Sequence, residues 1–320
     1  MLPGTPLGCT PLATFKVNLD TNVPIFRPPY RLPALYKDEI NKVISQMLQD
    51  GIVGKSNSPY GEPIVVVKKR QDDGSVKLRL CVDFRAINRH TIADNHPLPN
   101  ITELIDSVGD AAFFSVLDLA SGFHQIPVAE EDGHKLAFVT PDSHLEFCRL
   151  PFGVRNGPAQ FASQAKQLLE GQTNCLAFID DLLIFTKDFN SHMEIMKQVF
   201  ERLRAANLRC QPSKAVFCKT SVNYLGFLIT PEGHLPDPVR AKALLNAERP
   251  TNVRQIREYL GFVGYYRRHF PLFSQKAKCL TALLKKDAPF IWDENCEDSF
   301  NFFKQSLINA PILRSPDFNR

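Results

Sequence analysis

The chain has 320 residues, of which 44% are hydrophobic and 22% are charged, and its formal net charge is +4. These values are ordinary for a globular protein with a sizeable core, and they exclude a low-complexity chain. No apolar run approaches the ~18 residues of a membrane span, so we expect no membrane partner. The N-terminus lacks the pattern of a signal peptide, and the eight scattered cysteines predict reduced thiols in an intracellular protein.

The first part of the chain predicts an arm, a helix and a hairpin. Residues 1–34 are rich in proline and aperiodic, and we interpret them as an extended arm. Apolar residues at helical spacing predict an amphipathic helix over 35–49. Two strands are expected at 63–70 and 77–84, joined by a turn. Basic residues lie near the tip of this hairpin, a pattern that by itself is typical of a solvated edge.

The remaining elements mix strands and helices without the steady alternation of a parallel α/β fold. We expect strands at 113–119 and 223–229, helices at 161–170 and 192–207, and a strand–turn–strand unit at 175–185. After Pro238 the pattern becomes mostly helical. The chain is therefore predicted to have an α+β fold.

The unit at 175–185, CLAFIDDLLIF, places Asp180 and Asp181 inside a strongly apolar run. An ionised carboxylate in an apolar setting costs many kcal/mol unless a cation or hydrogen bonds compensate it. Tight hairpins prefer Asn-Gly or Asp-Gly, so a double Asp without glycine is a poor choice for the turn itself. A divalent cation resolves the conflict, because carboxylates commonly bind Mg²⁺ together with substrate phosphates.

Asp118 is a second acid at the end of an apolar strand. If the strands that carry Asp118 and Asp180 are neighbours in one sheet, three carboxylates meet at one edge. Such a group is typical of a two-metal site for in-line phosphoryl transfer. The alternative is three unrelated acids on the surface.

Positive charge gathers in the C-terminal third. Residues 240–286 contain eleven Lys and Arg but only two acids, a local net charge of +9 that leaves −5 for the rest of the chain. This cluster indicates a polyanionic partner, although a solvated basic face has the same composition.

A helix in this basic region has two distinct faces. One is apolar, with Val253, Ile256, Leu260 and Val263. The other contains Arg254, Arg257, Gly261, Gly264 and Arg268. A glycine inside a helix costs ~1 kcal/mol of stability relative to alanine, so the presence of two glycines in this helix requires an explanation. Two explanations are open: close approach of the helix to a nucleic-acid backbone, and close packing against another helix.

Five motifs in order resemble the reverse transcriptase of gypsy-type LTR retrotransposons. They are LCVDFRAIN at 80–88, VLDLASGFHQI at 116–126, LPFGVRNGPAQF at 150–161, FIDD at 178–181 and YLGFVGYYRR at 259–268. The resemblance runs from about Asn22 to Asp317. Two departures are Phe178, where many relatives have tyrosine, and Gly157 with Gln160, where alanine and threonine are usual.

The resemblance implies a right-hand polymerase with fingers, a palm with an antiparallel sheet, and a helical thumb. Its parts would be an arm at 1–34, fingers at 35–92 and 126–152, palm at 93–125 and 153–230, thumb at 231–305, and at 306–320 the start of a connection to an RNase H domain.

The resemblance also implies the site residues. Asp118, Asp180 and Asp181, with the carbonyl of Leu119, would bind two Mg²⁺ ions, with Mn²⁺ as a substitute. Lys214 would protonate the pyrophosphate leaving group. Nucleotide-binding positions would be Lys69, Arg79, Ser121, Gly122, Phe123 and Phe152, with Phe123 as an aromatic gate against a 2′-hydroxyl. Primer and template contacts would come from Pro158, Tyr224, Leu225 and Gly226, and from the Arg254–Arg268 face described above.

The implied function is RNA-directed DNA polymerisation on an RNA or DNA template with a primer and deoxynucleoside triphosphates. The implied partners are the protease, RNase H and integrase segments of a Pol polyprotein, in cytoplasmic particles whose DNA product reaches the nucleus. One alternative is a domesticated or decayed copy that only binds nucleic acid. Another is an RNA-dependent RNA polymerase, against which Phe123 argues.

Overall fold

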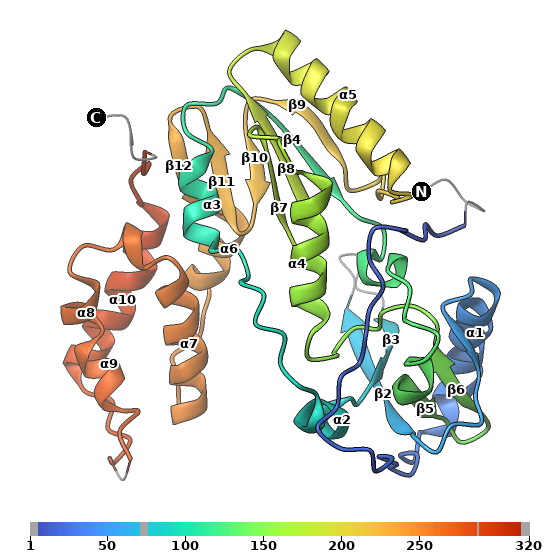
Figure 1. Cartoon of the computed structure of the whole chain (residues 1–320). Coiled ribbons are helices and arrows are strands. Elements are labelled where there is room, and N and C mark those ends of the chain that lie inside the picture. The colour runs from blue at the N-terminus through green and yellow to red at the C-terminus, as the bar shows by residue number, and fades with distance from the viewer. Residues whose placement is uncertain (1–5, 71–75, 287, 315–320) are drawn as a thin grey trace. The chain divides into compact units, whose positions relative to one another are not determined.

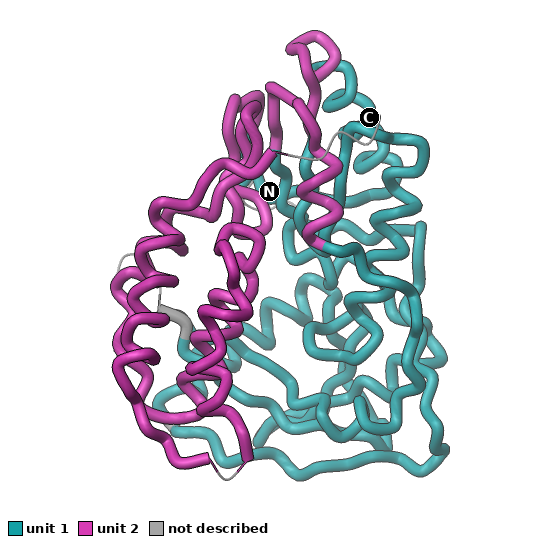
Figure 2. Tube along the Cα trace, turned by 90° about the vertical axis from the view of Figure 1, so that its left-hand side faces the viewer, with its two compact units in different colours: residues 1–100, 116–184, 193–216 teal, residues 101–115, 185–192, 217–320 magenta. Residues whose placement is uncertain are grey.

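The structure is a computed structural model that describes residues 6–70, 76–286 and 288–314. The chain divides into two compact units, coloured in Figure 2: residues 1–100, 116–184 and 193–216 form unit 1, and residues 101–115, 185–192 and 217–320 form unit 2. The predicted limits of fingers, palm and thumb follow a different division and stay predictions. Among the described helices, none combines the length and the apolar character that a membrane crossing requires.

The N-terminal segment of unit 1 is extended but packed. Phe15 and Val17 are both buried in the core, so this part of the predicted arm is packed against unit 1. Phe26 lies against Gly61, where an added Cβ would come within 2.8 Å of the Phe26 ring. The first long helix, α1 (Lys37–Gln49), follows a short 3-10 turn and confirms the predicted helix.

A five-stranded sheet with the order β1-β6-β5-β2-β3 forms much of the rest of unit 1 (Figure 1). Its strands are β1 (Val53–Lys55), β2 (Glu62–Arg70), β3 (Val76–Val82), β5 (Ala137–Val139) and β6 (His144–Phe147). The predicted hairpin is the antiparallel β2–β3 pair, and helix α2 (Arg85–His90) follows it. The predicted turn at 71–75 lies outside the described residues.

A second sheet has the order β7-β8-β4-β9. Its strands are β4 (Phe113–Asp118), β7 (Cys175–Phe178), β8 (Asp181–Thr186) and β9 (Val216–Lys219). Helix α4 (Gly157–Leu168) begins before the predicted start at 161, because Pro158 in its first turn needs no hydrogen-bond donor there. Helix α5 (Phe189–Ala205) likewise begins before the predicted start at 192. Asp188 caps its first turn, because its carboxylate accepts a hydrogen bond from the Ser191 N–H at 2.9 Å.

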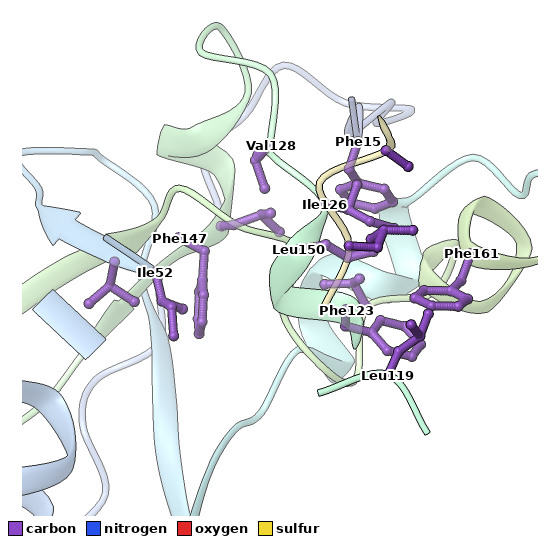
Figure 3. Packing of buried hydrophobic residues seen from close by; sticks show 14 of the residues in the cluster. Phe15, Ile52, Leu119, Phe123, Ile126, Val128, Phe147, Leu150 and Phe161 are labelled. Atoms are coloured by element: carbon purple, nitrogen blue, oxygen red, sulfur yellow. The ribbon is translucent and has the colours of Figure 1, made fainter. Parts of the chain in front are cut away.

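The core of unit 1 anchors the segment that follows β4. Figure 3 shows Leu119, Phe123 and Ile126 among the buried side chains of this cluster, near Leu150 and Phe161. Each large apolar side chain that is fully buried stabilises the fold by about 1.5–3 kcal/mol relative to an exposed one. The residues just after Asp118 are therefore held rigidly.

Unit 2 contains the sheet β10-β11-β12 and most of the C-terminal helices. The strands are β10 (Val222–Tyr224), β11 (Phe227–Thr230) and β12 (Gly233–Pro236). The helices are α3 (Ile101–Ser107), α6 (Pro238–Leu245), α7 (Val253–Tyr265), α8 (Phe273–Lys276), α9 (Lys278–Ala282) and α10 (Glu294–Ile308). The helical character predicted after Pro238 is confirmed.

The single strand predicted at 223–229 was wrong. Leu225 and Gly226 both have positive φ, 47° and 79°, and the chain reverses there between β10 and β11. Positive φ at both central residues is the geometry of a tight two-residue hairpin. The apolar pattern runs through the turn, so periodicity alone could not reveal it.

Candidate active site

Two adjacent strands bring the three predicted carboxylates to one edge of the second sheet. β8 lies next to β4. β7 and β8 pair up to Phe178 and Asp181, which leaves Ile179 and Asp180 as a two-residue turn. The Leu119 N–H donates to the Asp180 carbonyl oxygen at 2.9 Å, so the end of β4 is fixed beside this turn. The turn is strained, because Ile179 has a φ of 53°.

The surroundings of Asp180 and Asp181 raise the pKa of both carboxylates. Burial, followed by the charges of Asp118 and Asp181, raises the pKa of Asp180 to about 7. Burial and Asp118 also raise the pKa of Asp181. Lys214 opposes both shifts, and its Nζ lies 2.8 Å from Asp118 Oδ2. Excess negative charge in a partly buried place is the condition that favours cation binding.

The donor set fits a hard divalent cation. Mg²⁺ prefers carboxylate and carbonyl oxygens, and the buried Oδ1 of Asp180 has no hydrogen-bond partner among the described residues. No group of three or more His, Cys, Asp or Glu side chains in the described ranges forms a preformed metal cluster. The ion pair between Lys214 and Asp118 occupies one of the oxygens that such a cluster would use.

Gly122 is required by the closeness of Asp180. A Cβ built on Gly122 would lie 2.3 Å from Asp180 Oδ1 and 3.0 Å from the Phe161 ring. Real Cβ atoms do not approach an oxygen so closely, so any other residue would displace the carboxylate. Ser121 precedes it with a φ of 49°, which bends the chain tightly under the carboxylates.

A layer of aromatic rings continues from this point. Phe123 is 7% exposed, and its ring centroid lies 4.9 Å from that of Phe152 and 5.4 Å from that of Phe161. The Arg79 guanidinium lies 5.4 Å from the centre of the Phe152 ring. The predicted nucleotide-binding residues Arg79, Phe123 and Phe152 thus meet in unit 1. The backbone of Lys69 pairs in β2, but its side chain lies outside the described residues.

Sequence reasoning missed His124 in this layer. Its ring lies 5.2 Å from that of Phe152, and burial, with Arg149 and Arg79, lowers its pKa to about 4. A neutral histidine therefore lies among the aromatic rings at physiological pH. His124 lies between Phe123 and Gln125 and belongs to no periodic pattern, so the sequence does not indicate that its ring packs in this layer.

The other predicted contacts lie in two further places. Pro158 is half-buried in the first turn of α4, in unit 1. Tyr224, Leu225 and Gly226 form the β10–β11 turn region in unit 2, and Tyr224 is buried. We call residues 224–227 the primer hairpin, after the role that the motif resemblance implies.

Helix α7 has the two faces that its sequence predicts. Ile256 and Val263 are fully buried, while Arg254 and Arg257 are exposed. A Cβ added at Gly261 or Gly264 would meet no atom of the described residues within 4 Å, so close packing against another described helix does not explain these glycines. Their face is open to a partner.

Arg268 does not belong to that face. It lies beyond the end of α7, in a 3-10 turn over Arg267–His269. Its guanidinium donates to both oxygens of Asp106, at 3.1 and 2.9 Å. This pairing holds Arg268 against α3. Arg254 also pairs, with Glu258 one turn along its own helix at 3.0 Å, but its side chain is 87% exposed.

Comparisons with known proteins agree with these observations. Residues 67–229, half of the chain, match the family model described as "Reverse transcriptase (RNA-dependent DNA polymerase)". The chain is 37% identical over 322 residues to the Retrovirus-related Pol polyprotein from transposon 297 of Drosophila melanogaster, which covers 99% of this chain and 30% of that protein. It is 31% identical over 293 residues to the Transposon Tf2-3 polyprotein of Schizosaccharomyces pombe, covering 91% and 22%. The chain therefore spans less than a third of the length of these relatives.

Solved structures of similar fold include the foamy viral protease-reverse transcriptase dRH in complex with double-stranded DNA. The TM-score is 0.89 at 24% identity, covering 97% of this chain and 55% of that one. The same viral protein in complex with an RNA/DNA hybrid gives a TM-score of 0.87 at 23% identity, covering 97% and 42%. This likeness shows the fold, and it confirms the predicted right-hand polymerase class.

Proposed function

The chain belongs to the reverse transcriptase family, and we propose that it is the polymerase segment of a gypsy-type LTR-retrotransposon Pol polyprotein. In this role it extends a primer on an RNA or DNA template with deoxynucleoside triphosphates. The observation that supports this most directly is the meeting of Asp118, Asp180 and Asp181 at one sheet edge, where Asp180 lies directly against Gly122.

Asp118, Asp180 and Asp181, with the carbonyl of Leu119, would hold two Mg²⁺ ions, or Mn²⁺ in their place. When bound, such ions neutralise developing charge on the attacking and leaving oxygens of a phosphoryl transfer. The carboxylates supply the negative charge that draws these ions in. Burial, followed by neighbouring carboxylates, raises the pKa of Asp180 and of Asp181, and Lys214 opposes both shifts, so a bound cation would favour their charged forms.

Residues of the aromatic layer orient the nucleotide. Arg79, together with Lys69, binds triphosphate oxygens, for which a guanidinium has matching geometry. The Phe123 ring is fixed between Phe152 and Phe161, and in the proposed role it would exclude a 2′-hydroxyl, so that deoxynucleotides are favoured. Orientation of this kind contributes much of the rate in reactions that need little covalent chemistry.

Lys214 would supply a proton to the leaving group. Its ammonium lies 2.8 Å from Asp118 Oδ2, and its side chain is 64% exposed, so it can change partner when substrate enters. We assign it the role of general acid for pyrophosphate. A general acid typically contributes 10²–10⁴-fold to a rate.

The open face of α7 binds the nucleic-acid duplex. Arg254 and Arg257 contact phosphates, and Gly261 and Gly264 allow the backbone to come close. The foamy viral protein, which has been solved with double-stranded DNA and with an RNA/DNA hybrid, supports a duplex as partner. The other Pol segments are proposed partners in the full polyprotein.

Replacing both Arg254 and Arg257 with alanine should weaken primer–template binding and lower the slope of log Kd against log salt by roughly 1–2, since each phosphate contact releases counterions. Fluorescence anisotropy over a salt series measures both quantities. Lys242→Ala, a lysine on α6 outside this face, is the control. An unchanged slope in the double variant would contradict the assignment.

Primer extension on an RNA template with Mg²⁺ and deoxynucleotides tests the function itself, with Asp180→Asn beside the parent. We expect the parent to extend the primer and the variant to lose at least about 10²-fold in rate, because a site charge that stabilises the transition state is gone. Tight duplex binding without extension by the parent would instead support the alternative of a binding module.

A further inference from the structure

Residues outside the β10-β11-β12 sheet hold the turn of the primer hairpin in place. Leu225, a residue with a Cβ, has a φ of 47°, a conformation that L-residues seldom adopt without support. Three donors bond to the two turn carbonyls. The Tyr265 hydroxyl donates to the Leu225 oxygen, and the Tyr266 hydroxyl and the Asp237 N–H donate to the Gly226 oxygen, at 2.8 and 3.0 Å.

The two tyrosines are the last residue of α7 and the residue that follows it. Their rings lie 5.0 Å apart in a T-shaped pair, and each ring centroid lies 5.4 Å from that of Phe227 at the base of the hairpin. Tyr266 is 1% exposed, which means that its hydroxyl has no water to replace the Gly226 carbonyl. The hairpin and the end of α7 are thus joined by both ring packing and hydrogen bonds.

A third element closes the contact. Arg240 of α6 lies 6.0 Å from the centre of the Tyr265 ring, and its Nη1 lies 2.8 Å from the position that a Gly226 Cβ would take. Burial raises the pKa of Tyr266 to about 12 and also raises that of Tyr265. Both hydroxyls therefore remain donors throughout the physiological range.

The same helix presents its open face to a partner. Gly264 is adjacent to Tyr265 in the sequence, and Gly261 lies one helical turn before it, so the duplex-binding face ends at the residues that hold the hairpin. All of these residues belong to unit 2. A displacement of the α7 face should therefore also displace the Leu225–Gly226 turn, because the two are joined by ring packing and hydrogen bonds.

We infer that Tyr265 and Tyr266 are positioning residues that make the α7 face and the primer hairpin one rigid body, so that binding of the duplex sets the position of the primer end. This inference rests on the proposed function. The tyrosines touch neither nucleotide nor metal ligands in this assignment. They act through the Leu225–Gly226 turn.

The test is the double variant Tyr265→Phe with Tyr266→Phe, which removes both hydroxyls and keeps both rings. Tyr259→Phe is the matched control, because Tyr259 lies on the same helix, is buried, and donates its hydroxyl to the Phe300 carbonyl at 3.0 Å, away from the hairpin. Single-nucleotide incorporation on a preformed primer–template separates kcat from the KM for the nucleotide.

We expect the double variant to lose roughly tenfold or more in kcat, since small misplacements of a reacting group are costly, while the nucleotide KM stays within about twofold. The control should lower the melting temperature similarly without changing kcat. A double variant whose kcat equals that of the control would overturn the inference, because the hydroxyls would then be merely structural.

Amide hydrogen exchange distinguishes failure of this inference from failure of the proposed function. In the free protein, exchange at the Phe227 and Leu228 amides should be faster in the double variant than in the control. With a primer–template duplex added, those amides should become protected in the parent and not in the double variant. Equal exchange in both variants overturns the inference whatever the activity, and a parent that neither binds nor extends the duplex overturns it together with the proposed function.

Discussion

Two tight turns in this molecule begin with the same left-handed backbone conformation and have opposite surroundings. The carboxylate turn, Ile179–Asp180, and the turn of the primer hairpin, Leu225–Gly226, each join two antiparallel strands with two residues. Each begins with a bulky residue at positive φ, 53° for Ile179 and 47° for Leu225. A left-handed residue of this kind costs on the order of 1–2 kcal/mol, so both turns need compensation.

The compensation differs. The carbonyls of the primer-hairpin turn accept bonds from two tyrosine hydroxyls and one backbone N–H, so its polar groups are satisfied within the protein. The carboxylate turn has one backbone bond from Leu119 and a buried Asp180 oxygen without a hydrogen-bond partner among the described residues. One turn is completed by the protein, and the other is arranged to be completed by cations.

The largest effect should follow from Gly122→Ala. The new methyl group would need the space of Asp180 Oδ1, so the carboxylate must move, and we expect polymerase activity to fall about 10²-fold or more. Primer extension measures this. Gly54→Ala is the control, since its Cβ would meet only Cys148 Sγ at 3.5 Å. Near-parental activity of Gly122→Ala would contradict the described position of Asp180.

A second prediction concerns the stability of the carboxylate turn without metal. Asp180→Asn should raise the free energy of unfolding at pH 8 by about 1 kcal/mol, a value reduced for the partial solvent exposure of the site, because it removes a desolvated charge beside two others. Mg²⁺ should raise the melting temperature of the parent more than that of the variant. Asp110→Asn, at an exposed ion pair with Lys187, serves as control.

The sign of the pH dependence follows from the raised pKa. In the folded state Asp180 keeps its proton up to about pH 7, whereas in the unfolded chain the carboxyl releases it near the ordinary pKa of 3.8. The Asp180 contribution to stability is therefore present below pH 4 and is lost as the pH rises to about 7. The difference between variant and parent should grow over that window. Urea titrations at several pH values would reveal it, and a constant difference would contradict it.

The smallest effect is expected at the primer-hairpin turn. Gly226→Ala places a Cβ at a φ of 79°, where the strain costs on the order of 1 kcal/mol, and displaces the flexible end of Arg240. We expect a few-fold decrease in kcat with this loss of stability. Gly51→Ala, at a φ of 63° in open space, should cost similar stability and leave kcat unchanged. Equal kinetics for the two variants would mean that the turn does not position the primer.

Local patterns predicted much of the fold correctly. The α1 helix, the β2–β3 hairpin and the strand–turn–strand unit around Asp180 all lie where periodicity and turn chemistry place them. The single strand at 223–229 was wrong, because an apolar run continues through the Leu225–Gly226 turn. The extended arm predicted at 1–34 is packed at Phe15 and Val17, which the sequence did not indicate, because burial against distant residues produces no periodic pattern in an extended segment.

By itself, the sequence determined the residue types of the site: three acids at strand ends, a glycine and an aromatic residue after the first, and a basic helix with two glycines. Tertiary structure alone decided that β8 lies beside β4, that Lys214 pairs with Asp118, and that Tyr265 and Tyr266 hold the primer hairpin. The physical reason is the distance along the chain over which each interaction acts. Turn propensity and helical periodicity act over a few residues, whereas charge coupling and ring packing join groups that the chain brings together only when it folds.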